Sequence, residues 1–256
     1  FMGDGAVWNY VAMQQAIGSD IMMVLDVCIA STSGHDETRD AMERTHRWAV
    51  RSLAARDAEP TGQALFGIVQ GGLFPELRRE SAQFLTSLPF EGFAIGGLAV
   101  GEGRGPRNEM CELATSLLPA EKPRYLMGVG TPCDLLDGVR RGVDMFDCII
   151  PTKMAQQGYA YTFAGLLRTT RAVFALDNGP LDPSCSCFVC GRYTRGYLHH
   201  LMRGKHPLGA RLLAIHNVTH YQTLMARMRQ AIEQGTFDAL YSELWPALSR
   251  TEKGAA

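Results

Sequence analysis

Short apolar runs alternate with longer stretches of helical periodicity along the first 150 residues. The apolar runs are strand-sized and predict β-strands at residues 20–27, 65–69, 92–95, 123–127 and 143–150. Apolar positions three and four residues apart predict helices at residues 5–17, 37–56, 74–88, 106–118 and 132–141. Helices between consecutive strands require parallel strands joined by right-handed crossovers. The pattern therefore predicts an α/β fold built from five β/α units.

Each predicted strand ends on a residue that is suited to contact a ligand. These residues are Asp26, Gln70, Gly97, Met127 and Asp147. In parallel α/β proteins the carboxyl ends of the strands form one rim, where functional side chains gather. We therefore expect a ligand-binding rim rather than plain connections.

Asp147 needs a separate explanation, because it lies within the otherwise apolar run 143–150. The period of two in a strand places it on one face with Val143 and Met145. A carboxylate buried without partners is costly, so the residue must have a reason to be there. It is either a functional group at a strand end or the cap of a nearby turn, and this stretch alone favours neither.

Two architectures accommodate five β/α units. A (β/α)8 TIM barrel has eight strands, so this chain would supply the last five and three would precede residue 1. A doubly wound open sheet also fits. Because the chain opens on Phe1 and no signal-like segment follows, we expect its true start to be missing.

Three cysteines are closely spaced at Cys185, Cys187 and Cys190. Thiolates at this spacing can share one tetrahedral Zn2+ ion, with a histidine further along the chain as the fourth ligand. Unligated thiols and an iron–sulfur cluster are the alternatives, and the spacing favours zinc. We expect a structural role, since four protein ligands leave no open position for substrate.

Several histidines follow the cysteines and could complete this site. They are His199, His200, His206, His216 and His220. We favour His216, because it lies in a long amphipathic helix predicted at 208–234, which the metal would tie to the cysteines.

The residue pattern changes after residue 150. Alternating stretches at 158–162 and 169–176 predict a small antiparallel sheet. We therefore expect the barrel strands with their active-site rim at 1–150, a zinc-binding insert at 151–206, and the closing long helix and a C-terminal helix at 207–256.

Charge and composition restrict the possible partners. The formal net charge is -1, so contact with nucleic acid would need a local basic patch. One concentrated basic region comprises Arg192, Arg195, His199, His200, Arg203, Lys205 and Arg211. A solvated helix face is the commoner reason for such a run, and phosphate contact is the functional one.

The cysteine count and the lengths of the apolar runs bear on location. Seven cysteines, three of them in one cluster, favour a metal site in a reducing compartment over a disulfide framework. No apolar run approaches the length of a membrane span. With 256 residues, 46% of them hydrophobic, the chain can bury a sizeable core. We expect a soluble, cytoplasmic protein.

Five motifs occur in an order that points to one family. They are Phe66-Gly67-Ile68-Val69-Gln70-Gly71-Gly72, Gly96-Gly97-Leu98-Ala99-Val100-Gly101-Glu102, Tyr125-Leu126-Met127-Gly128-Val129-Gly130, Asp144-Met145-Phe146-Asp147-Cys148 and the cysteine cluster. Together they closely resemble the tRNA-guanine transglycosylases of bacterial type, in the queuine tRNA-ribosyltransferase family. The resemblance covers almost the whole chain. It implies a (β/α)8 barrel with a zinc subdomain inserted after the last strand.

The resemblance also implies a reaction. Members of the family are glycosyltransferases that exchange the wobble guanine of tRNA for a 7-deazaguanine base in queuosine biosynthesis, through a covalent aspartyl-ribosyl intermediate. Asp147 matches the catalytic nucleophile. The residues that match the base-binding groups are Asp26, Gln70, Gly97, Leu98 and Met127. The residues that match the zinc ligands are Cys185, Cys187, Cys190 and His216.

Val100 bears on which base is used. In the family, valine here accompanies bacterial enzymes that use the small base preQ1, whereas glycine accompanies enzymes that accept the larger queuine. The β-branched side chain would close the pocket where the cyclopentenediol of queuine lies. The resemblance therefore implies preQ1 or guanine, the tRNA anticodon stem-loop and, as in bacterial relatives, a second copy of the chain as partners.

Three differences from the family pattern matter. The upstream Asp-Ser-Gly-Gly segment, with a second catalytic aspartate, is not in this sequence, so we expect the fragment to be inactive or poorly folded alone. Lys153 and Gln156 stand where the family usually has arginines, which alters phosphate contact. The segment that follows Asp26 contains Cys28, whereas an acidic residue is commoner there in the family.

Two other functions compete with this interpretation. A non-catalytic, RNA-binding paralogue of the family is possible, although the presence of both Asp26 and Asp147 favours the enzyme. A (β/α)8 glycoside hydrolase would use the same two carboxylates as acid and nucleophile. It would leave the cysteine cluster and the basic region without a use.

Overall fold

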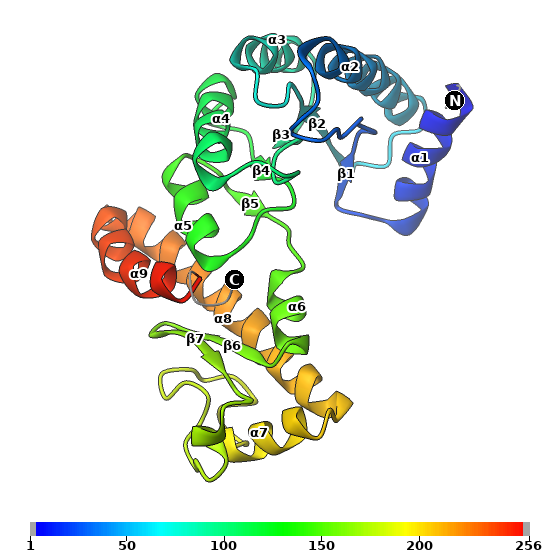
Figure 1. Cartoon of the computed structure of the whole chain (residues 1–256). Helices are drawn as coiled ribbons and strands as arrows, with labels where there is room; N and C mark the ends of the chain where they lie inside the picture. The colour runs from blue at the N-terminus through cyan, green and yellow to red at the C-terminus, as the bar shows by residue number, and fades with distance from the viewer. Residues whose placement is uncertain (1–3, 253–256) are drawn as a thin grey trace. The chain divides into compact units, whose positions relative to one another are not determined.

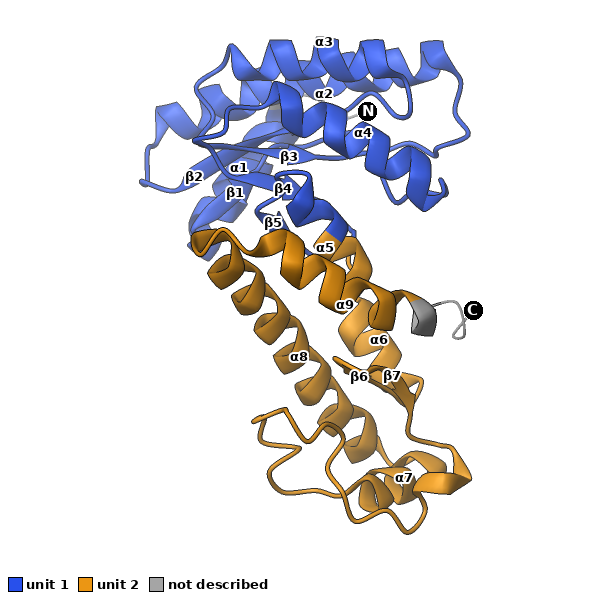
Figure 2. Ribbon diagram, turned by 90° about the vertical axis from the view of Figure 1, so that its left-hand side faces the viewer, with its two compact units in different colours: residues 1–129, 137–147 blue, residues 130–136, 148–256 orange. Residues whose placement is uncertain are grey.

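The computed structural model describes residues 4–252 and consists of two compact units (Figure 1). Unit 1 comprises Phe1–Val129 and Asp137–Asp147, and unit 2 comprises Gly130–Leu136 and Cys148–Ala256 (Figure 2). The expected division into segments 1–150, 151–206 and 207–256 stays a prediction.

Unit 1 contains a curled sheet of five parallel strands, which forms a half barrel (Figure 1). Its strands follow one another in chain order, and every neighbouring pair is parallel. They are β1 (Ile21–Met23), β2 (Ala64–Val69), β3 (Gly92–Ile95), β4 (Arg124–Leu126) and β5 (Met145–Phe146). The predicted α/β fold of five β/α units is confirmed.

Helices precede and connect these strands, as the periodicity predicts. They are α1 (Asp4–Ile17), α2 (His35–Ala58), α3 (Pro75–Thr86), α4 (Arg104–Leu117) and α5 (Pro132–Arg140). In α2, Asp36 and Glu37 occupy the first turn and Arg56 the last, which suits the helix dipole. Pro75 opens α3, where its missing N–H costs no hydrogen bond.

Close packing in the core of unit 1 depends on paired large and small residues. Phe66 of β2 and Phe93 of β3 are almost fully buried. The Phe66 ring lies against Gly92, where an added Cβ would collide with it. Phe90 lies in the same way against Gly67. Glycine in these strands therefore makes room for aromatic rings that fill the core.

Unit 2 is organised around one long helix and a two-stranded hairpin. Its elements are α6 (Ile150–Gln156), β6 (Tyr159–Thr162), β7 (Gly165–Arg168), the 3-10 helix η1 (Ala172–Phe174), α7 (Arg195–Arg203), α8 (Pro207–Glu233) and α9 (Phe237–Glu252). The strands β6 and β7 pair in antiparallel fashion. The predicted long helix is therefore confirmed as α8.

Three strand predictions differ from the structure. The run 20–27 pairs only at 21–23. The run 143–150 pairs only at 145–146, because α6 already begins at Ile150, with Pro151 in its first turn. The second hairpin strand is Gly165–Arg168 and not 169–176. Gly165 adopts a φ of 128°, which lets the chain turn straight after β6 and pairs it with Thr162.

The longest of the described helices, α8, has 27 residues but is not a membrane span. Across residues 4–252, no helix is both long enough and apolar enough to cross a bilayer.

Asn217 of α8 holds three backbone groups of unit 2. It is fully buried, and its Oδ1 accepts a hydrogen bond from Tyr161 N at 2.9 Å. Its Nδ2 donates to Pro151 O at 2.9 Å and to Tyr159 O at 3.0 Å. One side chain thus joins α8, α6 and β6, and satisfies polar groups that water does not reach.

Replacing Asn217 by alanine would leave these backbone groups unpaired. We expect Asn217→Ala to lower the free energy of unfolding by about 3 kcal/mol, because buried donors and acceptors lose their partners. Urea denaturation of the two proteins measures the difference. Asn178→Ala, at an exposed asparagine of the same unit, is the control and should change stability by less than about 0.5 kcal/mol. Equal stability of Asn217→Ala and the parent chain would contradict this role.

Candidate functional site

The carboxyl ends of the strands meet at one level of the sheet. The paired residues Val69, Ile95, Leu126 and Phe146 are in register across β2 to β5. The next residue on each strand is therefore Gln70, Gly96, Met127 or Asp147. Parallel pairing thus gathers residues that are far apart in the sequence.

A cavity of about 350 Å³ opens at this edge of unit 1. Its lining includes five of the six predicted catalytic and base-binding residues, namely Asp26, Gly97, Leu98, Met127 and Asp147. Gln70, the sixth, does not line the cavity and instead contacts Asp26. Val100 and Tyr125 also line it. The structure therefore brings the predicted rim residues together at one site.

Asp26 is half-buried and is held by Gln70. The Gln70 Nε2 donates a hydrogen bond to Asp26 Oδ2 at 2.7 Å. Burial raises the pKa of Asp26, and the hydrogen bond from Gln70 partly offsets that rise. A carboxylate in such a setting can accept further N–H donors from a ligand in the cavity.

A buried layer lies behind Gln70 itself. Its backbone N–H donates to Ser81 Oγ at 3.1 Å, and that hydroxyl lies 3.0 Å from His46 Nε2. Burial lowers the pKa of His46 to about 4, so its ring is neutral at pH 7 and can accept the hydroxyl proton. This chain of hydrogen bonds fixes the end of β2.

Asp147 is exposed to solvent, so the prediction of a carboxylate in a buried strand was wrong. It follows the short β5 and lies at the surface of the cavity. Its Oδ1 accepts hydrogen bonds from Tyr125 OH at 2.6 Å and from Gly128 N at 2.7 Å. Among residues 4–252 no hydrogen bond is made to its Oδ2. The carboxylate is therefore held by one oxygen, and the other can react.

Tyr125 was not singled out from the sequence, although it lies in one of the five motifs. Burial and then the hydrogen bond to Asp147 raise its pKa well above the usual value. The phenol therefore stays protonated and donates to the carboxylate throughout the neutral range. Tyr125 of β4 pairs with Met145 of β5, and Asp147 directly follows β5, so Tyr125 and Asp147 come from adjacent strands. No local spacing signals such a contact between residues 22 positions apart.

The loop after β3 is shaped by Glu102, another residue that sequence reasoning missed. Its carboxylate accepts hydrogen bonds from Ala99 N and, at 2.9 Å, from Val100 N. Gly97 and Ala99 both have positive φ, at 63° and 61°. Because the C=O and N–H of a trans peptide point in opposite directions, the Leu98 carbonyl points away from Glu102. The loop can thus present backbone groups to the cavity.

A second cavity, of about 660 Å³, shares Asp26 and Cys28 with the first. The rest of its wall is Val27 and one face of α2 with Arg44, Arg47, Trp48 and Arg51. The helical spacing of these arginines could have indicated a basic face. The smaller cavity is the better candidate for chemistry, because it alone holds both Asp26 and Asp147.

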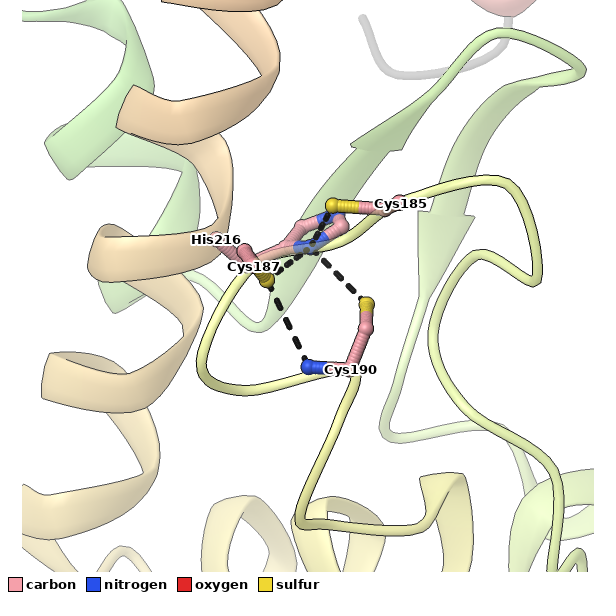
Figure 3. Close-up of side chains that lie close together, drawn as sticks. All are labelled: Cys185, Cys187, Cys190 and His216. Atoms are coloured by element: carbon pink, nitrogen blue, oxygen red, sulfur yellow. Dashed lines mark hydrogen bonds between the residues drawn. The ribbon is translucent and has the colours of Figure 1, made fainter.

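The three cysteines and His216 form one cluster in unit 2 (Figure 3). The Nδ1 of His216 lies 3.8 Å from Cys185 Sγ, 3.5 Å from Cys187 Sγ and 3.4 Å from Cys190 Sγ. All four ligand atoms lie within 4.8 Å of one another. Such a cluster could bind a metal ion, as the sequence indicates, with His216 as the fourth ligand.

The surroundings of His216 suit a metal ligand. Its Nε2 lies 2.8 Å from Tyr161 O, so this nitrogen carries the proton and Nδ1 is free to bind a metal. Burial lowers the pKa of His216, which keeps the ring neutral. Of the other candidates, His199 is bonded to Thr169 O at 2.9 Å and His220 packs against Phe163.

The basic region of unit 2 is only partly available to a partner. Arg195 pairs with Asp177 at 3.0 Å, and Arg192 lies over the Phe188 ring. The exposed members on α7, the following turn and the start of α8 are His200, Arg203, Lys205 and Arg211. Arg195 and Arg192 therefore have structural contacts, and the exposed members form a solvated, basic face.

Comparisons with known proteins assign the chain to a family. The sequence model of "Queuine tRNA-ribosyltransferase" matches residues 7–249. Proteins of that name from Thioalkalivibrio sulfidiphilus and Aliivibrio salmonicida are 48% and 46% identical to this chain, over 91% and 93% of its length. The chain belongs to the queuine tRNA-ribosyltransferase family.

The matched region is a part of those relatives. It covers 62% of the Thioalkalivibrio protein, 64% of the Aliivibrio protein and 63% of a third relative, from Mannheimia succiniciproducens, which is 47% identical. The chain thus spans a little under two thirds of the length of the curated relatives it matches.

Metal content tests the cluster. We expect Cys187→Ser and His216→Ala each to reduce bound metal from about one ion per chain to under about a tenth, because three ligands hold the ion weakly. Elemental analysis after exhaustive dialysis measures this content. Cys28→Ser, at an exposed cysteine outside the cluster, is the control and should retain the metal. Unchanged metal content in both cluster variants would show that the ion, if any, binds elsewhere.

Proposed function

We propose that this chain carries the base-exchange site of a tRNA-guanine transglycosylase, which replaces the wobble guanine of tRNA by preQ1. The observation that carries the proposal is one cavity with Asp147 on its wall beside Asp26, which Gln70 holds. Membership of the family supports it. Each residue then has a role that its surroundings suit.

Asp147 acts as the nucleophile. Its unbonded Oδ2 attacks C1′ of the ribose, the bond from C1′ to guanine N9 breaks, and the base leaves with the electron pair and takes up a proton. The N9 of the incoming base then attacks C1′ and loses its proton, and the ester bond breaks to restore the carboxylate. Two such displacements retain the configuration at C1′.

Tyr125 and Gly128 orient the nucleophile. Both donate to Oδ1, at 2.6 and 2.7 Å, so the carboxylate cannot rotate freely. The fixed oxygen leaves the other one directed at a bound ribose, which reduces the entropic cost of the attack. The same donors stabilise the carboxylate as a leaving group in the second displacement.

Asp26 recognises the base. An ionised carboxylate accepts hydrogen bonds from the N1–H and the 2-amino group that guanine and preQ1 share. Gln70 holds that carboxylate, and the Gly97 amide and the Leu98 carbonyl supply backbone contacts to the ring edge and the aminomethyl group. Met127 packs against a face of the ring. Because burial raises the pKa of Asp26, base binding weakens as the pH falls toward that raised pKa.

Val100 sets the size of the base. Its half-buried side chain lines the cavity, whose volume of about 350 Å³ suits a bicyclic base. The β-branched side chain leaves no room for the added ring of queuine, so preQ1 and guanine are the bases we propose.

Zn2+ is the ion we propose for the cysteine cluster. Three soft thiolates and one imidazole are the ligand set of structural zinc sites. Cys185, Cys187, Cys190 and His216 would hold it, and with four protein ligands it would supply structure alone. The ion would tie α8 to the cysteine loop, beside the exposed basic residues of α7.

The partners follow from the reaction. The substrate is the anticodon stem-loop of tRNA, whose phosphates Arg203, Lys205 and Arg211 can contact. A homodimer in the cytoplasm is the assembly that we propose. The activity is proposed for the full-length protein.

Guanine exchange tests this function. We expect the full-length protein to incorporate radiolabelled guanine into tRNA, with preQ1 as a competitor. Asp147→Asn should reduce the rate about a thousandfold or more, because the amide is a poor nucleophile.

Asp144→Asn is the matched control. Asp144 is exposed and lies three residues before Asp147. Its carboxylate accepts a hydrogen bond from Arg124 N at 2.9 Å, which an asparagine oxygen can also accept, so this change should alter the rate less than about twofold. A protein that binds tRNA but exchanges no guanine would be a non-catalytic, RNA-binding member of the family.

A further inference from the structure

Arg78 of α3 is fully buried, and within residues 4–252 its hydrogen bonds go to backbone carbonyls alone. Its side chain is 0% exposed. Its Nε donates to Gly72 O at 2.9 Å, and its Nη1 donates to Gly96 O at 2.9 Å and to Val69 O at 3.3 Å. Its Nη2 donates to Gly97 O at 3.2 Å. No carboxylate among residues 4–252 forms an ion pair with it.

A buried charge without an acidic partner is costly, so this arrangement needs a function. Burial lowers the pKa of Arg78 to about 10, which still leaves it charged at neutral pH. An apolar residue would fill the core at lower cost. What the guanidinium provides is a rigid fork that can hold several carbonyls at fixed angles.

The four carbonyls flank the two segments that carry base-binding groups. Val69 and Gly72 lie on either side of Gln70, and Gly96 and Gly97 directly follow β3. An added Cβ at Gly97 would collide with Gln70 Oε1, so the two segments touch there. One side chain therefore sets the relative position of Gln70 and Gly97.

The fork also fixes the direction of the Gly97 amide. The peptide bonds are trans, so a Gly96 carbonyl that points at Arg78 requires the Gly97 N–H to point away from it. Gly97 lines the cavity, whereas the fully buried Arg78 does not, so the N–H that points away from Arg78 is directed toward the cavity.

We propose that Arg78 is a positioning residue for base recognition, which holds the Gly97 N–H toward the six-position carbonyl of the bound base. The proposal rests on the proposed function of the cavity. A positioning role differs from a purely structural one, because its loss should weaken recognition of one part of the base and leave recognition of the other parts unchanged.

The test compares the binding of three bases to the zinc-loaded, full-length protein by calorimetry. They are 7-deazaguanine, its analogue without the six-position oxygen, and its analogue without the 2-amino group. In Arg78→Met we expect the preference for the six-position oxygen to fall about tenfold. The preference for the 2-amino group, which Asp26 reads, should stay within about twofold, because Ser81 still holds Gln70 and Gln70 still holds Asp26.

Two variants accompany this change. Arg78→Lys keeps the charge but cannot reach all the carbonyls, so we expect an intermediate loss, and it serves if Arg78→Met does not fold. Arg79→Met, at the exposed neighbouring arginine of α3, should bind all three bases as the parent does. Loss of both preferences to the same extent, or of neither, would overturn the proposal.

Amide hydrogen exchange gives a readout that is independent of the proposed function. The backbone amides of residues 96–98 should exchange faster in Arg78→Lys than in the parent and in Arg79→Met, and unchanged exchange would refute the positioning role. A parent protein that binds none of the three bases would refute the proposed function instead, and the exchange comparison would still decide whether Arg78 holds this loop.

Discussion

Parallel pairing of five strands is the constraint on which the site depends. The backbone hydrogen bonds put Val69, Ile95, Leu126 and Phe146 in register, so the residues that follow them share one edge. A shift of one strand by one residue would turn its side chains to the other face. The separation of Gln70, Met127 and Asp147 in the chain therefore does not matter, because the ladder fixes their positions in space.

The same edge is where the backbone stops pairing with itself, and its free groups need other partners. Arg78 donates hydrogen bonds to the carbonyls at the ends of β2 and β3. Glu102 accepts hydrogen bonds from the amides of the loop after β3, and Asp147 accepts one from the Gly128 amide. Unpaired groups that are left can then serve a ligand. The same hydrogen bonds thus stabilise the rim and position the groups that can bind a ligand.

Periodicity and spacing could predict the parts of this fold that depend on local sequence. The five β/α units and the cysteine cluster fall in this class, and the resemblance to a known family added the roles of Asp26 and Asp147. The exposure of Asp147 was mispredicted, because its apolar neighbours pair over only two residues before α6 begins. Tyr125, Glu102 and Arg78 were missed, since their roles arise from contacts across strands or loops that no spacing records.

The central claim is that Asp147 bonds covalently to tRNA. The most direct measurement is to incubate the full-length protein with an anticodon stem-loop RNA, denature it, and map any cross-linked peptide by mass spectrometry. The account predicts a ribosyl adduct on Asp147 that forms with loss of guanine and disappears when preQ1 is added. An adduct on another residue, or guanine exchange with no adduct at Asp147, would contradict it.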